Sequence, residues 1–102
     1  MNYMNTYNYI AKRMIEDTAY RNMILTELAA VRACCKRIAT TNDFNVARDT
    51  KQRCQVTATG LDQHLPKIEM IFKQHDTNTC LEQSLDSLIF HLDTINSRYY
   101  KI

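Results

Sequence analysis

Apolar residues recur along most of the chain at alternating intervals of three and four positions. Near the carboxyl terminus the alternation has no gap, and its members are Leu81, Leu85, Leu88, Leu92, Ile95, Tyr99 and Ile102. This spacing places apolar side chains on one face of an α-helix and is typical of helices that pack lengthwise against one another. No segment sustains the strict alternation of apolar and polar residues that indicates a β-strand. The pattern therefore predicts an all-α protein.

Turn-forming residues divide this pattern into three predicted helices. The first covers residues 6–39, which contain neither glycine nor proline. The second covers residues 43–74 and the third residues 79–100, with a polar stretch before each of them. Because short connections make neighbouring helices antiparallel, we expect one domain, residues 1–102, built as an antiparallel three-helix bundle with coiled-coil-like seams.

Residues that favour helix N-termini lie at both breaks. Asn42 or Asp43 is placed to cap the second helix. Thr79 and Glu82 match a capping box at the start of the third helix. In this motif each side chain accepts a hydrogen bond from a backbone N–H group that the helix leaves unpaired. These residues support the positions at which the second and third helices are predicted to begin.

The second predicted helix contains the single glycine and the single proline of the chain, Gly60 and Pro66. The apolar register runs through both residues without a slip, which favours one continuous helix that is kinked near Pro66. The alternative is a pair of shorter helices, the first ending near Gly60 and the next beginning with Pro66 in its first turn.

Two charged residues, Asp17 and Arg21, interrupt the apolar face of the first predicted helix. They are four positions apart and therefore within ion-pair reach on a helix. We favour an interpretation in which this pair flanks the core, which then rotates onto Ile15, Ala19 and Met23. A buried polar pair that sets the register of the helices is the alternative.

Composition excludes several classes of protein. One glycine and one proline in 102 residues are too few for an all-β fold or a doubly wound α/β fold, and no glycine-rich phosphate loop is present. The net charge of +2 does not argue for a nucleic acid or an anionic membrane as a bulk partner. No stretch is apolar enough to span a membrane, and the amino terminus does not resemble a signal peptide, which predicts a cytoplasmic protein.

Cysteine and histidine positions match no familiar reactive or metal-binding motif. The cysteines Cys34, Cys35, Cys54 and Cys80 form no CxxC pair, and the three histidines show no metal-ligand spacing. Antiparallel pairing about residues 40–42 places Cys54 well away from Cys34 and Cys35, so no disulfide is expected. We therefore predict no cofactor and no enzymatic activity, and a thiol- or metal-dependent enzyme is the least favoured hypothesis.

A difference in helix length singles out one end of the predicted bundle. The third helix is too short to cover the first two, whose hairpin is expected to project by about two to three helical turns, from about Val31 to Arg53. Six basic and two acidic residues lie between Arg32 and Arg53, and apolar side chains there have no third helix to cover them. The predicted partner-binding residues are Arg32, Arg37, Ile38, Phe44, Val46, Arg48, Lys51 and Arg53.

This projecting tip favours a small protein-interaction module, such as an adaptor, an inhibitor or a chaperone-like protein. The simplest occupant of the tip is a second copy, which would give a homodimer, and the competing occupant is a different protein with an acidic, apolar segment. A nucleic-acid-associated regulator that uses the basic tip is the alternative, although Phe44 is the one aromatic residue available there for stacking. The abundance of Asn, Ile, Lys, Tyr and Thr is associated with AT-rich genes such as those of phages and mobile elements.

Overall fold

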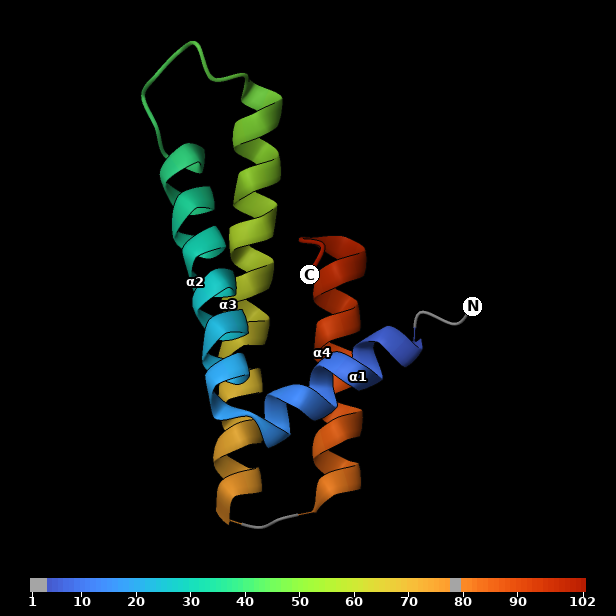
Figure 1. Ribbon diagram of the computed structural model, residues 1–102. Helices are drawn as coiled ribbons and strands as arrows, with labels where there is room; N and C mark the ends of the chain where they lie inside the picture. The colour runs from blue at the N-terminus through green and yellow to red at the C-terminus, as the bar shows by residue number, and fades with distance from the viewer. Residues whose placement is uncertain (1–3, 78–79) are drawn as a thin grey trace.

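The computed structural model of the chain describes residues 4–77 and 80–102, which form four helices (Figure 1). These are α1 (Met4–Glu16), α2 (Thr18–Ala39), α3 (Arg48–Thr77) and α4 (Leu81–Arg98). The prediction of an all-α protein is confirmed. The prediction of three helices is wrong, because the first predicted helix is divided into α1 and α2.

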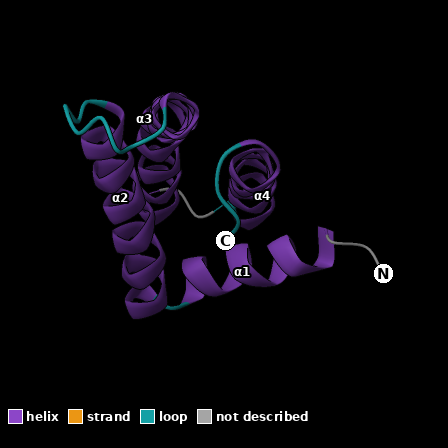
Figure 2. Ribbon diagram, turned by 90° about the horizontal axis from the view of Figure 1, so that it is seen from above, coloured by secondary structure: helices purple, strands orange, loops and turns teal. Residues whose placement is uncertain are grey.

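The helices pack as an antiparallel arrangement in which α3 is central. It packs along α2 on one side and along α4 on the other. Helix α1 turns away from the start of α2 and lies across α4, as the view from above shows (Figure 2). The core fills the space that these helices enclose, and its members are Tyr7, Ala11, Met14, Ile24, Leu28, Leu61, Leu65, Ile68, Phe72, Leu88, Leu92 and Ile95.

The break between α1 and α2 falls at Asp17, within the predicted first helix. The backbone of Asp17 is extended, and its side chain accepts a hydrogen bond of 3.1 Å from the N–H of Tyr20, which caps α2. The guanidinium of Arg21 donates to the carbonyl oxygens of Met14 at 2.9 Å and Ile15 at 3.3 Å. One residue thus caps the start of α2, and the other satisfies carbonyl groups that the end of α1 leaves unpaired.

Arg21 also joins this corner to α3. Its guanidinium lies 4.2 Å from the centre of the Phe72 ring and 3.6 Å from a carboxylate oxygen of Asp76. The expected rotation of the core onto Ala19 and Met23 is wrong, since both residues are exposed. Asp17 and Arg21, the polar residues that interrupt the apolar face, therefore form the corner between α1 and α2.

Helix α3 is continuous through Gly60 and Pro66, which confirms the predicted continuity, whereas the kink near Pro66 stays a prediction. Gly60 is buried, and a Cβ at this position would overlap the aromatic ring of Tyr99, which follows α4. The glycine therefore marks a point of close approach between α3 and the residue that ends α4. It does not mark a helix end.

The predicted starts of the last two helices are corrected by a few residues. Helix α3 begins at Arg48, so neither Asn42 nor Asp43 caps it. Cys80 is the N-cap of α4, and it makes no capping hydrogen bond through its side chain. Thr79, the predicted capping residue, lies outside the described residues.

The predicted apolar face of the last helix is confirmed over most of its length. Leu88, Leu92 and Ile95 have no exposed surface, whereas Leu81, at the start of α4, is 44% exposed. The face therefore enters the core only after the first turn of the helix. Of the helices that the structure describes, none is long and apolar enough to cross a membrane.

Candidate functional site

The hairpin of α2 and α3 projects past the end of α4, as the sequence predicted (Figure 1). The close approach of Tyr99 to Gly60 places the end of α4 beside the middle of α3. The segment of α3 from Arg48 to Thr59 therefore extends about 18 Å beyond the body, at about 1.5 Å per residue. Only α2 and the connecting loop pack beside it.

The loop at the end of this hairpin holds itself in a defined shape. The N–H of Val46 donates to the carbonyl of Asp43 at 3.2 Å, which closes a β-turn, and the Asp43 carboxylate accepts from the N–H of Asn45 at 2.9 Å. Phe44 is the first central residue of this turn and is 91% exposed. The hydrogen bonds of the turn therefore fix the backbone that carries the most exposed large apolar side chain of the described residues.

A shallow hollow lies beside this turn, between the end of α2 and the loop. Its volume is about 310 Å³, and its lining combines apolar side chains, a thiol, a hydroxyl and a guanidinium. The lining residues are Cys34, Arg37, Ile38, Thr41 and Val46. The structure thus brings together three of the predicted partner-binding residues, and it adds Cys34 and Thr41, which the sequence reasoning did not select.

The remaining predicted basic residues do not all belong to this surface. Arg32 and Lys36 both approach the carboxylate of Asp62 on α3, at 3.7 Å and 3.2 Å, so their charges are partly neutralised. Arg32 thus pairs with the middle of α3, and its role in partner binding stays a prediction.

The other basic residues of the tip have no such partner. Arg37, Arg48 and Arg53 are exposed and Lys51 is half-buried, and none of them forms an ion pair within residues 4–77 and 80–102. They add positive charge to the projecting part of the hairpin. We define the tip surface as Arg37, Ile38, Phe44, Val46, Arg48, Lys51 and Arg53.

Three cysteines lie close to the base of the tip. All four cysteines are free. The predicted separation of Cys54 from Cys35 is wrong, because Cys54 lies close enough to act on the pKa of the Cys35 thiol. The long loop and the later start of α3 shift the register of the hairpin and bring them together. Burial raises the pKa of the Cys35 thiol, and Cys54 and then Cys34 raise it further, which favours the protonated, weakly nucleophilic form.

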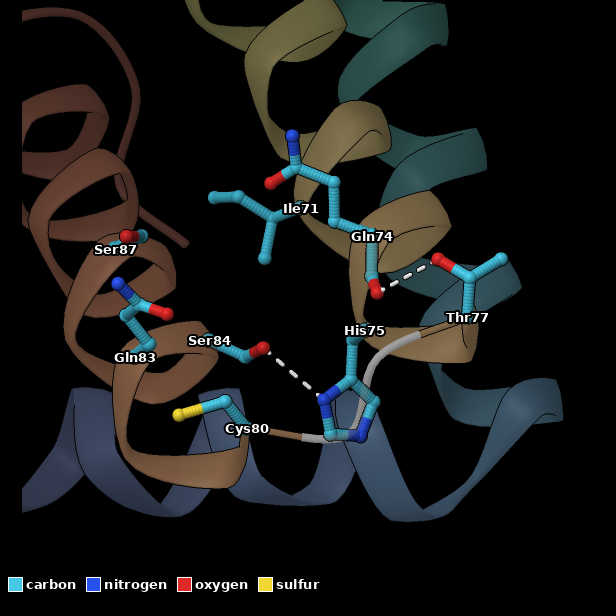
Figure 3. Close-up of a pocket in the computed structure, with 8 residues that line it drawn as sticks. All are labelled: Ile71, Gln74, His75, Thr77, Cys80, Gln83, Ser84 and Ser87. Carbon is cyan, nitrogen blue, oxygen red and sulfur yellow. Dashed lines mark hydrogen bonds between the residues drawn. The ribbon is translucent and has the colours of Figure 1, made fainter.

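A second hollow lies between α3 and α4, beside their turn (Figure 3). It has a volume of about 450 Å³ and is lined by Ile71, Gln74, His75, Thr77, Cys80, Gln83, Ser84 and Ser87. The His75 Nδ1 and the Ser84 Oγ are 3.0 Å apart and share a hydrogen bond. Among the described residues, no carboxylate bonds to the other nitrogen of His75, so the arrangement of a catalytic triad is incomplete there.

Two histidines that the sequence analysis left without partners also meet between α3 and α4. His64 Nδ1 and His91 Nδ1 are 2.9 Å apart, and the two rings are arranged edge to face. The signal that could have revealed this contact is their nearly equal distance along the chain from the α3–α4 turn, which makes them neighbours in an antiparallel hairpin. Sequence spacing alone was insufficient because it tests for motifs within one helix.

Within the described ranges, no group of three or more His, Cys, Asp or Glu side chains is placed to hold a metal ion. The chain matches no protein-family model, no curated protein and no solved structure. The function of this chain is therefore inferred from its own geometry and charge.

Proposed function

We propose that this chain is a non-enzymatic protein-interaction module that binds an acidic protein partner through the tip surface. The observation that carries the proposal is the 91% exposure of Phe44 at the end of a hairpin that its own hydrogen bonds hold in shape. An apolar ring displayed in this way adds nothing to the core. Its burial against a partner would contribute about 1.5–3 kcal/mol.

The surroundings of Phe44 supply the other parts of a binding surface. The half-buried side chains of Ile38 and Val46 line the adjoining hollow, which can accept an apolar side chain of a partner. The exposed Arg37 also lines this hollow. Arginine and aromatic residues are enriched where binding energy is concentrated in protein interfaces.

Charge favours a different protein over a second copy of the chain. Two tips packed against each other would bring Arg37, Arg48 and Arg53 of one copy toward the same residues of the other. Like charges that face each other across an interface reduce affinity, whereas a partner with Asp and Glu around an apolar segment complements them. The homodimer that the sequence suggested is therefore one outcome of the test below.

The test is affinity capture with three forms of the chain as bait. They are the parent, the double variant Ile38→Ser/Phe44→Ser, and Tyr9→Ser as a matched control. Tyr9 is 63% exposed on α1 and lies in the body, outside the tip surface. We expect the parent and the control to retain the same proteins and the double variant to lose them, while all three keep the same helical circular dichroism.

Three results would contradict the proposal. Retention of the same proteins by the double variant would place the binding surface elsewhere. Capture that nuclease treatment abolishes and that weakens steeply with salt would indicate nucleic acid, because phosphate contacts release counterions. A dimeric mass by light scattering that becomes monomeric only in the double variant would assign the tip to self-association.

A further inference from the structure

The contact between His64 and His91 has features that suggest a role beyond packing. His64 is only 9% exposed, and each histidine directly precedes a core leucine, Leu65 or Leu92. Helix α1 crosses α4 near its middle (Figure 1), and His91 belongs to the carboxyl-terminal half of α4. The pair therefore joins α3 to the part of α4 that borders the core.

The hydrogen bond between the rings requires a specific protonation state. One Nδ1 must carry a proton and donate it, and the other Nδ1 must be unprotonated to accept it. A first additional proton can bind to the Nε2 of the donor ring without breaking the bond. A second proton can bind only at the accepting Nδ1, which leaves two N–H groups pointing at each other. The contact is thus compatible with one added proton and incompatible with two.

The surroundings of the pair oppose proton uptake. Burial is the main cause that lowers the pKa of His64, followed by the charges of Lys67 on α3 and Arg98 at the end of α4. Burial also lowers the pKa of His91 most, followed by His64 and Lys67. No carboxylate from α1 or α2 is among the groups that set either pKa. The charges that help burial to lower the two pKa values are therefore those of basic residues.

The aromatic neighbours of the pair carry no charge that would offset an added proton. The Tyr99 ring centre is 6.1 Å from that of His64, and the Phe90 ring lies edge to face with His91 at 5.3 Å. The described residues place no third metal-binding side chain beside the two imidazoles.

We propose that His64 and His91 form an acid-sensitive latch, which holds the carboxyl-terminal half of α4 on α3 when neutral and releases it when both rings are protonated. The proposal does not depend on the tip surface. Release separates α4 from α3 at the level of Leu65 and Leu92, and so exposes apolar core surface between the two helices.

The direction of the pH dependence follows from the lowered pKa of both rings. In the released state each ring regains an ordinary pKa near 6.5, so that state binds more protons than the closed one below this pH. The closed state is therefore fully stable above about pH 6.5 and loses stability as the pH falls below it. The opening equilibrium constant rises by at most about tenfold per pH unit for each ring, or about a hundredfold for both.

Native-state amide hydrogen exchange, followed by NMR between pH 7.5 and pH 5, measures this opening helix by helix. After correction for intrinsic exchange rates, we expect the opening constant of amides near Leu92 in α4 to rise more than tenfold over this range, with little change in α2. The variant His91→Gln keeps a polar side chain that does not titrate, and it should flatten this rise. The matched control is His75→Gln, which removes the histidine at the other end of the same helix pair and should behave as the parent.

The outcomes that overturn the latch are equally specific. A pH-independent opening constant for α4 in the parent would contradict it, as would an unchanged rise in His91→Gln. If His91→Gln does not fold, the imidazole NMR signals of the parent decide. Two coupled titrations below the ordinary range support the latch, and two independent titrations near pH 6.5 refute it.

Discussion

Replacing Gly60 by alanine tests the packing of α3 against the end of α4 at a single atom. In most helix interiors this change is stabilising, because alanine favours the helix over glycine by about 1 kcal/mol. Here the added methyl group would overlap the ring of Tyr99, which packs directly on the Gly60 backbone. We therefore expect the substitution Gly60→Ala to reduce stability.

The magnitude follows from two opposing contributions. The gain in helix propensity is about 1 kcal/mol, and forcing an extra methyl group into a packed contact costs typically about 1–3 kcal/mol. The Tyr99 ring can move aside only by disturbing its contact with His64, at 6.1 Å between ring centres. The expected net effect is a loss of up to about 2 kcal/mol in the free energy of unfolding.

The assay is a double-mutant cycle measured by urea unfolding, with Gly60→Ala introduced into the parent and into a Tyr99→Ala background. Without the ring, the added methyl group has room, so Gly60→Ala should then stabilise the protein by about 1 kcal/mol. The two effects should differ by about 1–3 kcal/mol. A gain of the same size in both backgrounds would show that the α4 end does not pack on Gly60.

Further predictions concern the core, the corner between α1 and α2, and the cysteine thiols. Leu88→Asp should abolish cooperative unfolding, because it places an unpaired charge in a fully buried site, whereas Leu81→Asp at an exposed site should melt within a few degrees of the parent by circular dichroism. Arg21→Lys should lower the free energy of unfolding by about 1–3 kcal/mol in urea titrations. The ammonium group of lysine cannot bond to the carbonyls of Met14 and Ile15 and also stack on the Phe72 ring, as the guanidinium does. Iodoacetamide at pH 8 should alkylate exposed Cys34 faster than Cys35, whose pKa is raised by burial, and peptide mass spectrometry would reveal the reverse order if this reasoning fails.

The helical class and the continuity of α3 could be predicted from the sequence because both depend on periodicity. The apolar register continues through Gly60 and Pro66, and the structure keeps one helix there. Phe44, which the sequence pattern placed inside the second helix, lies instead in the turn before α3, and this position exposes it. The projection of the hairpin of α2 and α3 past α4 followed from the unequal lengths of the predicted helices. Both inferences require only the spacing of residues and the rise of a helix.

The division of the first predicted helix could not be found in this way. The apolar face stays in phase across Asp17 and Arg21, so periodicity gives no sign of the turn. The decisive contacts are a side-chain cap on the N–H of Tyr20 and an arginine that bonds carbonyls six and seven residues before it. Such contacts depend on the tertiary path of the chain, although an aspartate within a helical pattern is a known N-cap signal.

The histidine and cysteine contacts were missed because they join residues on different helices. The eight-residue loop, 40–47, was predicted as a short turn, and the resulting error in register separated Cys35 from Cys54. For His64 and His91 the predicted break between the last two helices was within a few residues of the observed one, yet the residues across it were not compared. Contacts between helices require the register of the hairpin as well as the pattern of each helix.

The central claim, that the tip surface binds a protein partner, is tested most directly by affinities measured with one captured partner. Isothermal titration calorimetry gives the affinity of that partner for the parent, for Phe44→Ala and for Tyr9→Ala. The comparison separates the contribution of the exposed Phe44 ring in the tip surface from that of the exposed Tyr9 ring in the body. Loss of the burial of Phe44 should weaken binding by about tenfold to a hundredfold, and Tyr9→Ala should change it by less than about twofold. Equal affinities for the parent and Phe44→Ala would contradict the claim.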